Sequence, residues 1–152
     1  MKDIQTKQDV RPWLNLGQSA QYTISGPPIP LKRPRFGLGH VFDSQKREKY
    51  GAGLQLKSQH EYVLPFDGPL KLEVTFFMPM PKRLAKKNHV DGSAPHYIKP
   101  DIDNLLKFLL DAANNVIIKD DSLVSCVVAN KIYSLCPRTE LTITRLEPDG
   151  SK

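Results

Sequence analysis

Cysteine is scarce in this sequence, with only Cys126 and Cys136 among 152 residues. Neither belongs to a CxxC pair or lies in a His-rich segment, so the sequence does not support a structural zinc site, which needs four ligands. We expect two free thiols, at least partly buried, in a cytosolic protein. A disulfide bridge between them stays open at this stage.

Long apolar segments are also missing. No run approaches the roughly 20 residues that cross a bilayer. Residues 1–16 carry scattered charges and no continuous apolar core, which does not fit a secretory signal peptide. We therefore expect a cytoplasmic protein with no membrane partner.

Acidic residues are outnumbered, with 16 Asp and Glu against 22 Lys and Arg, which gives a formal charge of +6. This excess favours a polyanionic partner but carries no information about the fold. The length suits one domain, and 39% hydrophobic with 25% charged residues is typical of a globular chain.

The first third of the chain predicts a polar arm followed by the start of a domain. We expect residues 1–20 to form the arm and residues 21–148 to form the domain. Alternating apolar residues predict a short strand over 21–25, and the prolines that follow end it. Residues 31–42 predict a basic hairpin centred on two glycines. Asp43 and Ser44 are candidate caps for a helix that ends near Tyr62.

The remaining segments predict one more helix, three strands and a long loop. Strict alternation over 70–78 predicts a strand, and two further strands are expected over 123–133 and 139–146. Residues 79–100, with four prolines, predict a long loop that is either functional or disordered. The best helical pattern runs from Asp103, as N-cap, to about Asn114. Together these elements predict an α+β domain with a mixed sheet of about four strands and two helices.

Acidic residues gather where the loop enters this helix. Asp101 and Asp103 are two residues apart in a segment that begins extended, which points both side chains the same way. Lys107 and Asp111 continue one polar stripe of the helix, with Asn104 beside it. Asp120 and Asp121 precede the strand that starts near Leu123, and one of them would join the acids if that strand starts beside the helix.

Three carboxylates in one place repel each other unless a cation binds between them. All-oxygen ligation suits Mg²⁺, which keeps several waters and accepts a phosphate oxygen. An acidic site within a basic surface is what phosphodiester hydrolysis requires, because cations hold the backbone while the metal activates water. Each piece alone has an ordinary structural explanation, such as a cap, a turn or a salt bridge, and only the combination is informative.

Residues 100–124 resemble the RusA family of Holliday junction resolvases. The runs PDIDNLLKFLLDAANN and KDDSLV are similar to the family pattern D-x-D-N-L-x-K-x-x-x-D-A followed by D-D-x-x-V. The Lys32-Arg-Pro-Arg35 hairpin and the Phe-Met-Pro end of the strand over 70–78 also look like the family. The resemblance covers most of the chain from about residue 21.

The resemblance implies a homodimeric nuclease that cleaves four-way junctions and other branched DNA in recombination and repair, in a family with many phage and prophage members. It assigns the metal to Asp101, Asp103 and Asp121, and a functional role to Lys107. Mg²⁺ is the expected cofactor, with Mn²⁺ as a substitute. The strands over 70–78 and 123–133 are candidate dimer surfaces. Two rival functions are a non-catalytic binder of branched DNA and a Mg²⁺-dependent hydrolase of other nucleic acids or nucleotides.

Several other residues receive an expected role. Asp111, Asp120 and Asn104 are secondary candidates for the site, and Asp111 is expected to hold Lys107. His96 is a poor Mg²⁺ ligand and suits a loop position or a phosphate contact better. The residues expected to bind the DNA backbone are Lys32, Arg33, Arg35, Lys82, Arg83, Lys86, Lys87 and Lys99.

Overall fold

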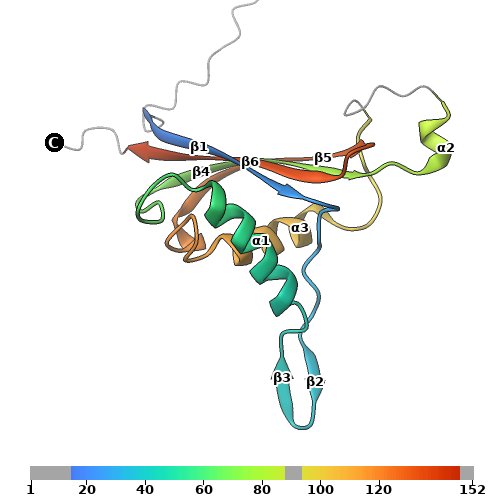
Figure 1. The fold of residues 1–152 in the computed structure, drawn as a ribbon, viewed down its shortest axis with the longest axis horizontal. Helices are drawn as coiled ribbons and strands as arrows, with labels where there is room; N and C mark the ends of the chain where they lie inside the picture. The colour runs from blue at the N-terminus through green and yellow to red at the C-terminus, as the bar shows by residue number, and fades with distance from the viewer. Residues whose placement is uncertain (1–14, 88–93, 148–152) are drawn as a thin grey trace, which may run out of the picture.

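The structure, a computed structural model, describes residues 15–87 and 94–147 (Figure 1). Its elements in chain order are β1 (Asn15–Ser25), β2 (Arg35–Gly37), β3 (His40–Phe42), α1 (Lys46–Gln59), β4 (Leu70–Pro79), α2 (Lys82–Ala85), α3 (Ile102–Ala113), the 3₁₀ turn η1 (Asp121–Leu123), β5 (Val124–Ser134) and β6 (Arg138–Glu147).

The main sheet is mixed and has four strands in the order β1-β6-β4-β5. β4 and β5 are parallel, and α3 forms the crossover between them, while the β1–β6 and β6–β4 pairs are antiparallel. β2 and β3 form a separate hairpin. The predicted α+β domain with a four-stranded mixed sheet and two long helices is confirmed, and α2 adds a short third helix.

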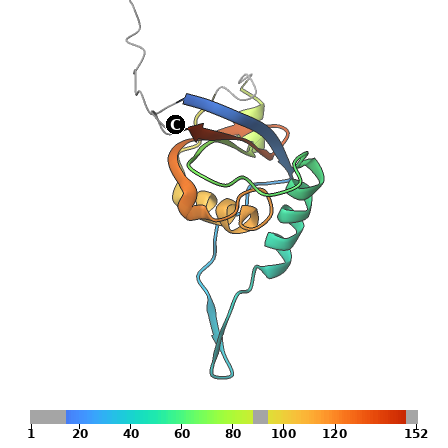
Figure 2. The ribbon, with the colours of Figure 1, turned by 90° about the vertical axis from the view of Figure 1, so that its left-hand side faces the viewer.

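The core lies between one face of the sheet and the two long helices, which cover that face in both views (Figures 1 and 2). β4 supplies the centre of the core, and α1 adds Leu56 while α3 adds Leu105 and Leu109. The buried residues of β4 are Leu70, Leu72, Val74, Phe76 and Met78. The interpretation that this apolar face could receive a second chain is therefore wrong, because the chain covers it with its own helices.

Three element boundaries differ from the predictions. β1 begins at Asn15 rather than Gln21, because β6 extends far enough to pair with residues 15–20 despite their weak pattern. The first long helix begins at Lys46, and neither Asp43 nor Ser44 is its N-cap. The best helix begins at Ile102 with Asp101, not Asp103, as N-cap, because the amides of Asn104 and Leu105 already donate to the Asp101 carbonyl. Residues 1–14 of the expected arm lie outside the described residues.

Three further predictions concern the hairpin, the two cysteines and membrane-spanning segments. The hairpin over 31–42 is confirmed. Both cysteines are free thiols, and Cys136 is exposed, so the expectation that it is at least partly buried is wrong. Among the described residues, no helix is long and apolar enough to cross a membrane.

The two long helices approach closely at Gly53, where a Cβ atom would lie 3.3 Å from the Ala112 carbonyl oxygen. Beside this contact the Lys49 ammonium joins the helices. It lies 2.7 Å from Asp43 Oδ2 and 2.9 Å from Asp111 Oδ2. Burial alone would lower the pKa of Lys49, but its hydrogen bonds to Asp43 and Asp111 raise it above the usual value. Asp111 is thus a structural partner of Lys49, and not of Lys107 as predicted.

Replacing Lys49 by Met should lower stability modestly, because it leaves the two half-exposed carboxylates of Asp43 and Asp111 without their shared cation. We expect a loss of about 1 kcal/mol, seen as a fall in Tm of about 2–4 °C in thermal unfolding. Lys57→Met, in the exposed last turn of the same helix, is the control and should leave Tm within 1 °C or so of the parent. Equal Tm values for both variants would show that this bridge does not stabilise the fold.

Candidate active site at the start of α3

Asp101 and Asp103 lie at the start of α3, and both carboxylates are exposed. Asp101 is the N-cap residue, yet its side chain makes no capping hydrogen bond. The positive end of the helix dipole favours negative charge at both positions. Both carboxylates therefore lie exposed at the first turn of α3, and no helix amide occupies the carboxylate oxygens of Asp101.

Each carboxylate has a lysine partner. Lys99 Nζ lies 3.1 Å from Asp101 Oδ2, and Lys107 Nζ lies 3.6 Å from Asp103 Oδ2. All four side chains are more than half exposed, and ion pairs of this kind contribute about 0–1 kcal/mol. A metal ion or a phosphate can displace such pairs easily. Lys99, predicted to bind DNA, is paired with Asp101 in this structure.

Lys131 of β5 supports the segment that leads into Asp101. Its ammonium donates hydrogen bonds of 2.6 Å to the carbonyl oxygens of both Ile98 and Pro100. The backbone adds two more links, from the His96 amide to the Lys131 carbonyl and from the Tyr133 amide to the Ala94 carbonyl, each 2.9 Å long. Residues 94–100 are thus fixed to the carboxyl-terminal half of β5, and Asp101 follows directly.

His96 belongs to this supporting structure. Its side chain is 8% exposed, and its ring centroid lies 4.7 Å from that of Tyr133. Burial, together with the nearby Lys131 charge, lowers the pKa of His96, so the ring is neutral at pH 7. A buried, neutral ring packed on Tyr133 suits a structural role better than the phosphate contact considered above.

Asp120 and Asp121 lie at the other end of β5. Val124 pairs with Leu70 at the start of the parallel strands, and Lys131 lies seven positions further on, opposite Phe76. The strand advances by roughly 23 Å over that distance. Because α3 returns from the end of β4 to the start of β5, its first turn and η1 lie at opposite ends of the strands. The condition under which Asp120 or Asp121 would join Asp101 and Asp103, a β5 that starts beside the start of α3, is therefore not met within one chain.

The described residues contain no group of three or more His, Cys, Asp and Glu side chains that could hold a metal ion. Asp121 is exposed in η1. Asp120 accepts a hydrogen bond from the Ser122 hydroxyl, which is the main reason that its pKa is lowered. Asp120 therefore behaves as a turn residue. Within one chain, Asp101 and Asp103 form a pair that Asp121 does not join.

This pair fits a magnesium ion by its donor chemistry. Mg²⁺ in proteins is commonly held by one or two carboxylates and keeps several waters. Exposed carboxylate oxygens at Asp101 and Asp103, paired only with displaceable lysines, meet that requirement. Asn104 is a secondary candidate. Its main-chain carbonyl oxygen accepts a hydrogen bond of 2.9 Å from the Leu31 amide, which links α3 to the segment before the hairpin.

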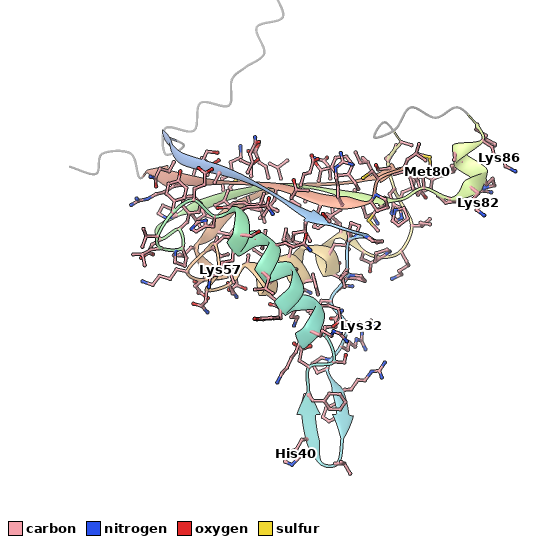
Figure 3. All side chains as sticks on the ribbon, viewed as in Figure 1. Lys32, His40, Lys57, Met80, Lys82 and Lys86 are labelled. Atoms are coloured by element: carbon pink, nitrogen blue, oxygen red, sulfur yellow. The ribbon has the colours of Figure 1, made fainter. Side chains whose placement is uncertain are left out.

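The predicted DNA-binding residues that the structure describes are all exposed and lie on three segments. Lys32, Arg33 and Arg35 lie on or before β2, and Lys99 precedes α3. Lys82, Arg83, Lys86 and Lys87 lie on and just after α2. Figure 3 shows Lys82 and Lys86 at one end of the molecule and Lys32 at the base of the hairpin, with Lys57 on the other side.

Sequence reasoning missed Lys131 and Lys49. A signal for Lys131 was present, because it shares the inward face of its strand with Ala129 and Tyr133, where a charge needs a partner. Lys49 gave no such signal, since its two partners lie on different elements.

Two comparisons relate the chain to known proteins. Residues 25–144 match the family described as Endodeoxyribonuclease RusA. The chain is also 34% identical over 133 residues to the uncharacterized protein YqaN of Bacillus subtilis (strain 168), an alignment that covers 81% of this chain and 94% of the relative. The matched range contains Asp101, Asp103 and Lys131 together with the whole hairpin. The chain therefore belongs to the RusA endodeoxyribonuclease family.

Proposed function

We propose that this chain is a Mg²⁺-dependent endonuclease that cleaves four-way junctions and other branched DNA in the cytoplasm, with Mn²⁺ as a substitute metal. The observation that carries the proposal is the exposed pair Asp101 and Asp103, held at the start of α3 by Lys131, in a member of a DNA nuclease family. A non-catalytic DNA binder has no use for two carboxylates that would face the phosphates.

The proposed roles follow from the positions of the residues. Asp101 and Asp103 would hold Mg²⁺, which supplies charge neutralisation at the phosphate and lowers the pKa of water. Lys107, 3.6 Å from Asp103, would turn from that carboxylate to the phosphate and stabilise the negative charge that develops there. Lys99 would exchange Asp101 for the DNA backbone in the same way.

Asp121 requires a second chain if it is to act in this site. It lies at the opposite end of β5 from Asp101, so one chain cannot bring them together without rearranging the sheet. Symmetric nicking of a four-way junction also calls for two chains related by a two-fold axis. We therefore propose a homodimer in which each site combines Asp101 and Asp103 of one chain with the partner's Asp121.

A complementation experiment tests this arrangement directly. Asp101→Asn and Asp121→Asn chains should each be inactive alone. If sites are shared, mixing and refolding them gives heterodimers with one intact site, which nick a labelled four-way junction on one strand. If every site lies within one chain, the mixture stays as inactive as its components. A stable monomer in light scattering that still cleaves the junction would contradict the dimer.

The substrate class needs its own assay. Wild-type protein with Mg²⁺ should cut a labelled four-way junction and leave a linear duplex, a single-stranded RNA and free nucleotides intact. Tight junction binding without cleavage in Mg²⁺ or Mn²⁺ would favour the non-catalytic binder. Preferential cleavage of RNA or nucleotides would favour a different hydrolase.

Binding should depend strongly on salt, since each backbone phosphate that a Lys or Arg neutralises releases a counterion. Replacing Lys82, Arg83, Lys86 and Lys87 together by Gln should reduce the slope of log affinity against log salt by about three to four. Lys57→Gln, on α1, is the control and should leave the slope unchanged. If the variant with all four residues replaced keeps the wild-type slope, the α2 region does not contact the DNA.

A further inference from the structure

The hairpin of β2 and β3 stands apart from the rest of the domain. Figures 1 and 2 show it projecting beyond the start of α1, away from the sheet. No residue of either strand is buried. The hairpin therefore adds nothing to the core, and its side chains are available to another molecule.

Its tip is apolar, which is costly for a surface that meets only water. Phe36 is 85% exposed and lies opposite Val41 on one face, while Leu38 in the turn is fully exposed. On the other face the Phe42 ring packs over Gly37, where an added Cβ would lie 3.1 Å from it. Phe42 thus packs against its own hairpin, whereas the side chains of Phe36 and Leu38 are left almost wholly exposed.

The turn itself is unfavourable for its sequence. Leu38 and Gly39 have φ values of 48° and 77°, so both central residues are left-handed. Two-residue turns of this kind favour Asn-Gly, because a bulky side chain at positive φ is strained. A leucine here costs both backbone strain and solvent exposure, and the isolated chain gains nothing from either. Strain of this kind points to a binding function.

The charge at the base of the hairpin indicates which partner the hairpin meets. Residues 31–42 contain Lys32, Arg33 and Arg35 but no Asp or Glu. None of these three forms an ion pair with any side chain in residues 18–87 or 94–146, the side chains that the structure describes. A second copy of the hairpin would bring like charges together, whereas a nucleic acid would neutralise them.

We propose that the β2–β3 hairpin is a wedge that enters the branch point of DNA, where Phe36 and Leu38 contact unstacked bases while the basic stem follows the phosphates. This inference rests on the proposed function, because it names the part of the substrate that the hairpin recognises. A two-stranded ribbon fits the major groove, and apolar side chains inserted between bases are a known means of opening a stack.

The test uses the full chain in EDTA, so that binding is separate from cleavage. The variant Phe36→Thr with Leu38→Asn removes the apolar tip but keeps residues that favour the strand and the turn. Probes are a four-way junction with 2-aminopurine at the crossover and a linear duplex of the same sequence. Wild type should bind the junction more tightly and raise the 2-aminopurine fluorescence. The variant should lose about tenfold in junction affinity, together with the fluorescence rise, and keep its duplex affinity within about twofold.

Val63→Asn is the matched control, because Val63 is 99% exposed and follows the opposite end of α1. It should behave as wild type on both probes. A hairpin variant that keeps junction preference and fluorescence overturns the wedge while leaving the nuclease proposal intact. Loss of self-association, or of binding to anionic phospholipid vesicles, with junction binding unchanged would assign the tip to another partner. If wild type binds the junction no better than the duplex, the proposed function itself fails.

Discussion

Asp101→Asn and Asp103→Asn should each reduce cleavage of a four-way junction by about 10²–10³-fold or more, while junction binding survives or tightens. Asn keeps the shape of the side chain but loses the charge that holds the metal. It also removes a negative charge near the phosphates, so affinity in EDTA should rise slightly. Single-turnover cleavage in Mg²⁺, paired with a binding titration, measures both effects.

Asp111→Asn is the matched control on the same helix. Asp111 carries the same charge within three turns of Asp103, but its carboxylate bonds to Lys49 and supports the contact between α1 and α3. This variant should cleave at close to the wild-type rate and lose only stability. If it is as inactive as Asp103→Asn, general acidity of the helix surface, and not the pair at its start, would explain the loss.

The fold could be predicted from the sequence where one face of an element is strongly apolar. The alternation over Leu70–Met78 and the apolar stripe of α3 are of this kind, and both elements lie where predicted apart from the N-cap of α3. Residues 15–20 could not be assigned, because they enter the sheet only through pairing with β6. The buried contact at Gly53 likewise depends on the helix that packs against it.

The site was only half predictable. Asp101 and Asp103 are close in sequence, so their neighbourhood follows from local geometry. The position of Asp121 depends on the direction of β5 relative to α3. Once β4 and β5 are known to be parallel, the crossover helix must run back along them, which separates its start from the start of β5. A pattern of spaced acids carries no information on that direction.

Lys131→Met should lower kcat for junction cleavage by about 10–100-fold and change the binding of DNA little. The substitution keeps the length of the side chain but leaves the Ile98 and Pro100 carbonyls without the ammonium that joins them to β5. Asp101 follows Pro100 directly, so its carboxylate loses its fixed position, and losses of this size are typical when the support of a metal-holding group is removed. A higher Mg²⁺ requirement for cleavage should accompany the lower kcat, and faster amide exchange over residues 94–101 should report the loosened segment.

Lys71→Met separates this effect from loss of charge. Lys71 lies on β4, pairs with Glu73 and touches no part of the segment before α3. Both variants remove one positive charge, so any general weakening of DNA binding is common to them, and only Lys131→Met should change kcat and the Mg²⁺ requirement. Lys131→Arg keeps a donor near both carbonyls and should recover part of the rate. If Lys131→Met and Lys71→Met have the same kcat and the same exchange over residues 94–101, Lys131 does not position Asp101.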